Sequence, residues 1–314
     1  MISLLGLDPA TYRPHPLHDD ERTYTETNCY ADCMIELVAA SGWEPEAMFA
    51  GAVEVDYELD QWTFFKPPAD DLRRLYGIET HEMQPYRSLP HQVAERLAAG
   101  QTLLPELDSW WLPDTAATSY RTEHVKTSVV AEAIDLDAKV FRYFHNAGYH
   151  ELSGEDFDGV FAAATSAAMP PYVDLVRFDA GAPLVGEAAR AEALALLREH
   201  LGRRSRGNPF EAFRARLEAD LPGLLEGDLA DYHAYAFANA RMAGASFELL
   251  ASHVRWLAGG DGEPAAAALD DVVGGTKMLL FRLARRRAFD VAGVVGPMAE
   301  RWQAAIDHLD ALAG

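Results

Sequence analysis

The sequence predicts an α+β fold followed by an all-helical domain, and two patterns along the chain support this division. Residues 29–42 have apolar side chains at helical spacing, and mostly strand-like segments follow as far as residue 178. From residue 187 onward the apolar residues recur at helical spacing without a strand pattern. We therefore predict an N-terminal α+β domain over residues 1–182 and a helical domain over residues 183–314.

The first long helix is predicted to begin at Cys29. Thr27 and Asn28 form a helix-start signal directly before it, and Gly42 ends the apolar pattern. MISLLGL at the N-terminus is a candidate strand. The segments after Gly42 are predicted as a short helix, a strand pair, a helix, a strand and a helix, at residues 45–51, 53–65, 68–77, 78–86 and 89–100.

Antiparallel strands dominate the rest of the predicted α+β domain. Residues 125–135 and 139–148 form a hairpin around the turn at 135–137. Ser153 and Asp156 resemble a capping box that opens a short helix. The remaining predicted strands lie at residues 102–112 and 172–178, and the helices of the second domain lie at residues 187–204, 210–225, 229–258 and from 265 to the C-terminus.

The composition excludes several classes of protein. Hydrophobic residues make up 49% of the 314 residues, which is enough for a sizeable core. The formal net charge of −22 repels phosphate backbones, so we expect no nucleic-acid partner. No segment is long and apolar enough to span a bilayer, and the N-terminus lacks the features of a secretory signal. We therefore expect a cytoplasmic protein without a membrane partner.

The two cysteines, Cys29 and Cys33, are too few for a disulfide framework and lie one helical turn apart. No second cysteine pair and no nearby histidine complete a zinc site, so no metal site is predicted. Phosphate-binding loops and dinucleotide-binding glycine motifs are also missing, and we expect no bound cofactor.

Cys29 is the strongest candidate for chemistry in the sequence. The unpaired N–H groups at the start of a helix stabilise a thiolate, which is the reactive form of cysteine. Papain-like enzymes place their nucleophile at such a position. The alternative is that Cys29 is simply a small buried residue, and this alternative suits Cys33 better because Cys33 lies a turn deeper beside apolar residues.

A nucleophilic cysteine needs a base, and the base needs a group that orients it. His124 precedes one strand of the predicted hairpin, and His145 and Asn146 end the other. Because the two strands pair, these side chains are predicted to converge. The order Cys, His, Asn matches the order in papain-like enzymes, although a single histidine of this kind is often structural.

Several further side chains are candidates for contact with a substrate. Aromatic residues line acyl pockets but more often form part of a core. Asp108 and Asp114 flank the tryptophan pair and are either polar groups of the site or turn residues. The predicted substrate-binding residues are Asn28, Trp62, Asp108, Trp110, Trp111 and Tyr120.

Two arginine clusters interrupt the acidic sequence, at residues 203–206 and 282–287. Each is explained either as a solvated helix end or as a docking surface for an acidic partner.

Runs of this sequence resemble two families. NCYADCMIELVAASGWEPEAMFAG resembles the opening of the butirosin-biosynthesis protein H family, and ELDSWWLPDTAATSYRTEHVKTSVVAEAID and LSGEDF resemble later segments of it. NCY, DQWTFFKPP, WLPDT and YFHNAGY are similar to signatures of an uncharacterised bacterial family across most of the chain. One departure concerns Thr127, which stands where the butirosin-type relatives carry a histidine before the valine strand, while His145 or Asn146 falls at their third, acidic position.

The resemblance implies a papain-like acyltransferase of specialised metabolism. It implies that Cys29 takes an acyl or aminoacyl group from the phosphopantetheine thioester of a carrier protein and passes it to the amine or hydroxyl of a small-molecule acceptor. His124 would be the base, oriented by His145 or Asn146. The alternatives are a cysteine hydrolase, either peptidase or thioesterase, and a non-catalytic carrier-protein-binding module. The sequence does not indicate the oligomeric state.

Overall fold

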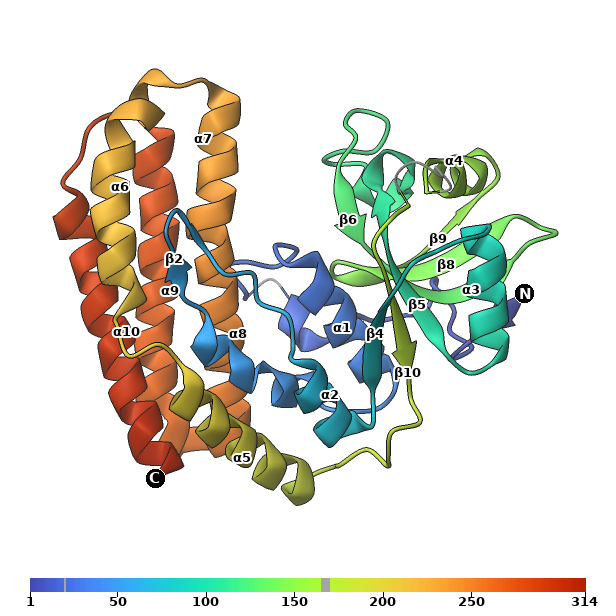
Figure 1. The fold of residues 1–314 in the computed structure, drawn as a ribbon, viewed down its shortest axis with the longest axis horizontal. Coiled ribbons are helices and arrows are strands. Elements are labelled where there is room, and N and C mark those ends of the chain that lie inside the picture. The colour runs from blue at the N-terminus through green and yellow to red at the C-terminus, as the bar shows by residue number, and fades with distance from the viewer. Residues whose placement is uncertain (20, 165–169) are drawn as a thin grey trace. The chain divides into compact units, whose positions relative to one another are not determined.

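The computed structural model describes residues 1–19, 21–164 and 170–314, and the chain divides into two units (Figure 1). The sheet unit comprises Met1–Asp19, Cys29–Pro45 and Ala69–Leu184. The helical unit comprises Asp20–Asn28, Glu46–Pro68 and Val185–Gly314. The helical unit therefore combines the C-terminal helices with two segments from the first part of the chain.

The sheet unit contains two antiparallel four-stranded sheets, ordered β1-β7-β8-β9 and β4-β10-β5-β6. Its strands are β1 (Ile2–Ser3), β4 (Glu79–Met83), β5 (Thr102–Asp108), β6 (Lys126–Ser128), β7 (Val130–Asp135), β8 (Val140–His145), β9 (Gly148–Ser153) and β10 (Val173–Arg177). Its helices are η1 (Pro16–His18), α1 (Cys29–Ala40), α2 (Ala69–Tyr76), α3 (Leu89–Ala98), η3 (Ser109–Trp111), η4 (Pro113–Thr115) and α4 (Glu155–Ala163). The predicted α+β class with antiparallel sheets is confirmed.

The predicted hairpin is present as β7 and β8, which pair from Val130 with Phe144 to Asp135 with Val140. The single strand predicted over residues 125–135 is divided in two, because β6 pairs with β5 whereas β7 pairs with β8. Val129 marks the change of sheet, and its N–H donates to the Pro105 carbonyl. One continuous β pattern thus supplies both sheets.

Helix α1 packs against β6, β7 and β8 in the sheet unit. It is buried along nearly its whole length, and the buried residues run from Tyr30 to Val38. A separate apolar cluster joins α3 and α4 to the strands through residues such as Val93, Phe141 and Phe161. The helix that begins at Cys29 is therefore enclosed on most sides, and its partly exposed residues are Cys29 at its start and Ala39 and Ala40 at its end.

The helical unit consists mainly of long helices that run beside one another, and α9 packs against both α8 and α10 (Figure 1). Its helices are α5 (Glu187–Arg203), α6 (Pro209–Glu226), α7 (Leu229–Ala236), η5 (Phe237–Arg241), α8 (Met242–Ala258), η6 (Gly259–Gly262), α9 (Glu263–Ala284) and α10 (Val291–Ala313). The helical C-terminal region is confirmed. The strand pair predicted over residues 53–65 shortens to the hairpin of β2 (Tyr57–Glu58) and β3 (Gln61–Trp62), which follows η2 (Pro45–Glu54).

Two local predictions need correction. The helix predicted over residues 229–258 contains a π-helical turn, η5, between α7 and α8. The capping box at Ser153 and Asp156 is not formed, because Ser153 ends β9 and Gly154 occupies the cap position with a φ of 61°. In the described parts of the chain, no helix has the length and apolar character needed to cross a membrane.

Candidate active site around helix α1

Helix α1 begins at Cys29, as the sequence predicts, and Cys29 is partly exposed to solvent. Within the described chain its sulfur has no hydrogen-bond partner. Asn28, the preceding residue, belongs to the helical unit, where its side-chain amide donates to the Phe65 carbonyl over 2.7 Å. Cys29 is therefore the accessible thiol at the N-terminus of a buried helix.

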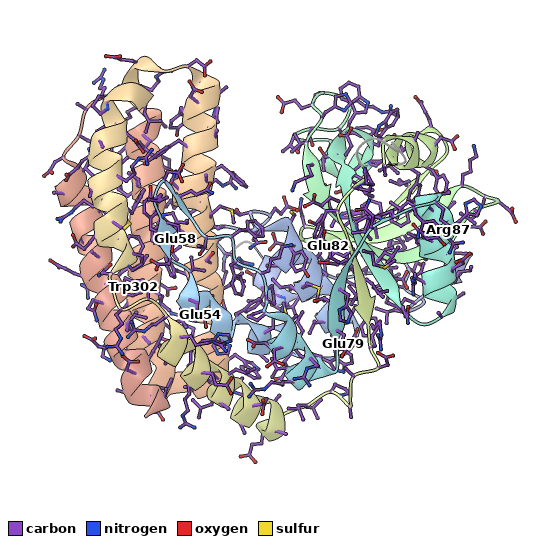
Figure 2. All side chains as sticks on the ribbon, viewed as in Figure 1. Glu54, Glu58, Glu79, Glu82, Arg87 and Trp302 are labelled. Atoms are coloured by element: carbon purple, nitrogen blue, oxygen red, sulfur yellow. The ribbon has the colours of Figure 1, made fainter. Side chains whose placement is uncertain are left out.

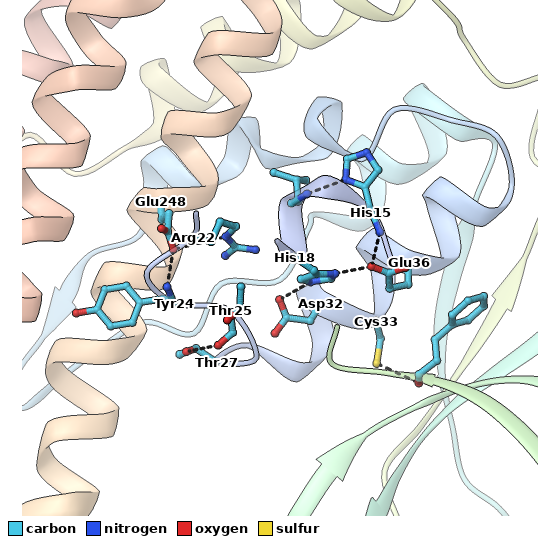
Figure 3. A network of polar contacts seen from close by, with 12 residues as sticks. His15, His18, Arg22, Tyr24, Thr25, Thr27, Asp32, Cys33, Glu36 and Glu248 are labelled. Carbon is cyan, nitrogen blue, oxygen red and sulfur yellow. Dashed lines mark hydrogen bonds and ion pairs between the residues drawn. The ribbon is translucent and has the colours of Figure 1, made fainter. Parts of the chain in front are cut away.

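Cys33 is a different kind of cysteine, because it is fully buried and its sulfur is held by the strands. The Sγ of Cys33, which is labelled in Figure 3, lies 3.2 Å from the Ser128 carbonyl and 3.5 Å from the Phe144 carbonyl. Burial, and then the charges of Cys29 and Asp32, raise the pKa of Cys33 well above its usual value. These features suit a structural thiol and not a nucleophile.

The contacts of Cys33 also position Cys29. Residues four apart in a helix lie on the same face, so Cys29 lies one turn before Cys33 on the same side of α1. Ser128 directly follows Thr127, and Phe144 directly precedes His145. The face of α1 that carries both cysteines is therefore directed toward the strand ends that hold Thr127 and His145.

Thr127, His145 and Asp114 form a continuous hydrogen-bonded chain. The His145 Nδ1 lies 2.5 Å from the Asp114 Oδ2, and the His145 Nε2 lies 2.8 Å from the Thr127 Oγ1. Relative exposures are 1% for His145, 8% for Thr127 and 7% for the Asp114 side chain. Tyr143 completes the network by donating its hydroxyl to the Asp114 Oδ1 over 2.5 Å.

The surroundings define the charge and the proton positions in this chain. Burial acts to raise the pKa of Asp114, but the hydrogen bond and charge of His145, helped by Tyr143, bring it below its usual value. Burial, then the charge of Asp114, raise the pKa of Tyr143 well above its usual value, so Tyr143 remains a donor. Because Nδ1 faces a carboxylate, a neutral His145 carries its proton there, and Nε2 accepts the Thr127 hydroxyl.

A second histidine–aspartate pair lies at the surface of the sheet unit. The His124 Nδ1 is 2.6 Å from the Asp108 Oδ2, and the imidazole stacks on Trp110 with ring centroids 4.6 Å apart. The His124 side chain is 68% exposed. No partner for its Nε2 is found among the described residues, so this imidazole is oriented at one nitrogen and open at the other.

His124 and Asp108 line a cavity of about 430 Å³. Tyr172 lines the same cavity, and its hydroxyl donates to Asp174 over 2.8 Å. The other oxygen of Asp174 accepts the hydroxyl of Tyr30, the second residue of α1, over 3.2 Å. Helix α1 is thus connected near its start to a wall of the His124 cavity as well as to the strands that carry His145.

Asn146 lies in the turn between β8 and β9 with a φ of 48°, a left-handed conformation that asparagine adopts more readily than most residues. Its backbone N–H interacts with the Cys33 sulfur and partly offsets the upward shift of the Cys33 pKa. Its side chain makes no hydrogen bond within the described chain. In the structure it is therefore Asp114, and not Asn146, that contacts His145; the sequence had left Asp114 open as either a polar group of the site or a turn residue.

The predicted aromatic residues are distributed over several environments. Trp111 packs on Gly159 of α4, where a Cβ would lie 2.2 Å from the indole, and Arg121 stacks above it at 4.2 Å. The Tyr120 hydroxyl donates to Asp156 over 3.0 Å. Trp62 belongs to the helical unit, where it packs among Tyr57, Phe210, Phe213 and Phe247. Of the predicted aromatic residues, Trp110 is therefore the one that contacts a candidate catalytic histidine.

A buried cluster that the sequence interpretation missed lies beside the two cysteines on α1, since Asp32 and Glu36 follow Cys29 at i+3 and i+7 (Figure 3). His18 bonds through Nδ1 to Glu36 and through Nε2 to the Asp32 Oδ1, the latter over 3.2 Å. Burial acts to lower the pKa of His18, but the hydrogen bonds to the two carboxylates outweigh it and raise this pKa. Glu36 also accepts the Tyr12 hydroxyl and the His15 N–H, so the cluster fastens the N-terminal segment to α1. Two acidic residues four apart within an apolar helix were the available signal.

Comparison with protein families gives the chain a clear affiliation. A DUF1839 N-terminal domain model matches residues 13–178, and a DUF1839 C-terminal domain model matches residues 186–311. No curated protein matches the chain. Among the described residues, no group of three or more histidine, cysteine, aspartate or glutamate side chains is arranged to hold a metal ion. The chain belongs to the DUF1839 family, with both domains of that family present.

Proposed function

We propose that this protein is a cysteine-dependent acyltransferase with a papain-like sheet unit. In this proposal Cys29 takes an acyl or aminoacyl group from the phosphopantetheine thioester of a carrier protein and passes it to an amine or hydroxyl of a small molecule. The observation that carries the proposal is the buried Asp114–His145–Thr127 chain, which lies beside the face of a helix that begins with a partly exposed cysteine.

The arrangement supplies the groups that acyl transfer needs. A nucleophile at a helix N-terminus has nearby N–H groups that stabilise both its thiolate and the oxyanion formed on attack. His145 has the distance to Asp114 that a base has to its orienting carboxylate. The resemblance of the α1 segment to the butirosin-biosynthesis protein H family supports the same assignment of Cys29 and the papain-like description of the unit.

His145 is proposed as the base, with Asp114 as its orienting group. His124 remains the competing candidate, because its pair with Asp108 is also well oriented and its Nε2 is open. The contacts of Cys33 favour His145, since they lie beside Thr127 and His145 in the chain. Asn146 is not needed as an orienting group in this scheme.

One of the two arginine clusters is suited to a carrier protein, whose surface is expected to be acidic. In the first cluster Arg203 binds Glu54, which is labelled in Figure 2, over 2.9 Å, and Arg204 binds Asp310 over 3.1 Å. In the second, no carboxylate of the described chain lies within ion-pair distance of Arg282, Arg285 or Arg287.

Apolar side chains accompany the second cluster on α9. Met278 is 52% exposed and Phe281 is 57% exposed. With Arg282 they follow the spacing i, i+3, i+4, which places the three on one face of α9, and Arg285 at i+7 caps the end of the helix in a helical conformation. Such a face offers cations for recognition and apolar area for contact, and we propose it as the docking site for the carrier protein.

The experiment that tests the covalent step is intact-protein mass spectrometry. The probes are acetyl and glycyl thioesters of pantetheine, free and attached to a carrier protein. We expect an adduct of the acyl mass on the wild-type protein and on Cys33→Ala, and none on Cys29→Ala. The proposal fails if wild-type protein gains no adduct, or if Cys29→Ala gains the same adduct. A free acid as the only product, whichever amine is supplied, would instead identify a hydrolase.

The docking face is tested with the same probes. We expect Arg282→Glu with Arg285→Glu to raise the KM for the acylated carrier protein by about tenfold, because charge reversal repels an acidic partner. Free acyl-pantetheine serves as the matched control, since its reaction does not use the docking face. An unchanged KM for the carrier protein would show that it docks elsewhere.

A further inference from the structure

The Thr127 hydroxyl bonds the Nε2 of the buried His145. His145 is 1% exposed, and both of its ring nitrogens are engaged, Nδ1 with Asp114 and Nε2 with Thr127. A proton can leave or reach Nε2 in this arrangement through the atom bonded to it, which is the Thr127 oxygen. A hydroxyl is suited to this task because it donates one hydrogen bond while it accepts another.

The other contacts of Thr127 leave its hydroxyl available for this exchange. Thr127 pairs with Leu107 in the β5–β6 ladder through its backbone. The bond to His145 is the hydrogen bond found for its hydroxyl within the described chain, so both lone pairs of the oxygen are left to accept from other donors. Cys29 is the partly exposed thiol one helical turn before Cys33, and the Cys33 sulfur contacts the carbonyl of Ser128, the residue after Thr127.

From this geometry we infer that Thr127 relays protons between the Cys29 thiol and His145, in the order Cys29–Thr127–His145–Asp114. The inference rests on the proposed function and makes Thr127 a positioning and relay residue, whereas Cys29 remains the nucleophile. Thr127 is less suited to be the nucleophile itself, since it is 8% exposed and its hydroxyl is a weaker nucleophile than a thiolate.

The transfer balances in two steps. In the first, the Cys29 S–H proton passes to the Thr127 oxygen as the Thr127 hydroxyl proton passes to the His145 Nε2. The thiolate attacks the thioester carbonyl, the bond from carbon to the pantetheine sulfur breaks, and that sulfur leaves with a proton returned by His145 through Thr127. In the second, the acceptor amine attacks the Cys29 thioester, loses a proton to His145 by the same route, and the released Cys29 sulfur recovers it.

Alkylation of Cys29 by iodoacetamide tests the relay without any acyl donor. We expect Thr127→Val to reduce the alkylation rate at neutral pH on the order of tenfold and to move its pH profile upward, because the isosteric side chain cannot pass a proton. Thr127→Ser should restore the wild-type profile. His145→Gln should behave like Thr127→Val, and the double variant should be no slower than either single variant, because residues of one relay are not additive.

Thr102→Val is the matched control. Thr102 is buried in the same unit, and its hydroxyl donates to backbone carbonyls and not to a histidine. Its alkylation profile should equal that of wild type, and thermal unfolding of each variant verifies that the fold is retained. The relay would be overturned by any of three results. These are an unchanged pH profile of alkylation in Thr127→Val, additive losses of alkylation rate in the double variant, and a Cys29 that is as unreactive in wild type as in Thr127→Val.

The acyl probes separate this inference from the proposed function. We expect Thr127→Val to slow formation of the Cys29 adduct by roughly 10²- to 10⁴-fold, the usual contribution of proton transfer by a positioned side chain. An adduct mapped to Thr127 would overturn the relay and leave acyl transfer intact. Loss of alkylation in Thr127→Val together with no acyl adduct on wild-type protein would support the relay and refute acyl transfer.

Discussion

The sheet unit contains two histidines that each bond to an aspartate through Nδ1, and the two pairs differ in every other respect. His145 and Asp114 are buried, and the remaining nitrogen of His145 is held by Thr127. His124 and Asp108 lie at the rim of a cavity, and the remaining nitrogen of His124 is open. Burial fixes the orientation of the first imidazole and restricts its proton exchange to one hydroxyl, whereas exposure leaves the second accessible and screened by water.

This comparison shows that a histidine–aspartate distance alone does not identify a base. The two Nδ1 distances are 2.5 Å and 2.6 Å and are nearly equal. What separates the pairs is the environment of Nε2 and the position of each pair relative to α1. Variants of the two pairs therefore separate the effect of a buried histidine–aspartate pair from that of an exposed one.

The largest expected effect concerns activity. His145→Gln should lower the rate of Cys29 acylation by roughly 10²- to 10⁴-fold, because the relay loses its terminal proton acceptor. His124→Gln should change the rate by less than about tenfold, since its pair does not lie in the relay. Acylation is followed by mass spectrometry with acetyl-pantetheine. The reverse ranking of the two variants would assign the base to His124.

His18 extends the comparison to a buried histidine whose two ring nitrogens both contact carboxylates. His18→Gln should lower the free energy of unfolding by about 3–5 kcal/mol, because it leaves Asp32 and Glu36 buried without their partner. The raised His18 pKa adds a pH signature. The stability that protonated His18 contributes is fully present below the unfolded pKa of about 6.5 and is lost as pH rises through the folded pKa.

Urea unfolding between pH 5 and pH 9 measures this effect. Wild-type stability should fall as pH rises above about 6.5, and His18→Gln should lack that decline. His81, which is exposed, provides the control variant His81→Gln, whose pH dependence should follow wild type. Parallel curves for wild type and His18→Gln would show that His18 is not charged in the folded protein.

Asp114→Asn should lower the free energy of unfolding by about 1–3 kcal/mol, since the amide keeps the shape but loses a charge-assisted bond to a buried histidine. The lowered Asp114 pKa gives the opposite pH window to that of His18. The stability that ionised Asp114 contributes is present above the unfolded pKa of about 3.9 and is lost as pH falls through the folded pKa. The free energy of unfolding of wild type should therefore fall more steeply at low pH than that of Asp114→Asn. Equal acid profiles would contradict a charged Asp114.

The smallest expected effect belongs to the exposed pair. Asp108→Asn should change stability by roughly 0–1 kcal/mol, because water and salt screen the interaction of Asp108 with His124. Any change should shrink further in 1 M NaCl, where the Debye length is about 3 Å. Urea unfolding at low and high salt measures this difference. A salt-independent loss of more than about 2 kcal/mol would show that the pair is structural.

Much of the site could be predicted from local sequence. The start of α1 at Cys29 followed from a helix-start signal and helical spacing, both of which are properties of neighbouring residues. The β7–β8 hairpin that presents His145 followed from two alternating segments around a short turn. The structural nature of Cys33 followed from its position one turn deeper among apolar residues.

The partners of these residues could not be predicted in the same way. Asp114 lies in the short η4 helix, just after the strand predicted over residues 102–112, and nothing local shows that it meets His145, which is 31 residues away. The division of residues 125–135 between two sheets was equally hidden, because one alternating pattern suits either sheet. Glu46–Pro68 joined the helical unit through packing such as that of Trp62 on Phe210, which no local signal records.

The sequence by itself determined the element types, the antiparallel hairpin, the helical C-terminal region and the thiol at a helix start, because periodicity, turn residues and caps act over a few residues. Only the tertiary structure decided which histidine contacts which carboxylate and which imidazole is buried. It also decided that Thr127 bonds to the Nε2 of His145. Hydrogen bonds between distant segments depend on the packing of whole sheets and helices. That packing is set by all the buried contacts together and not by any single run of residues.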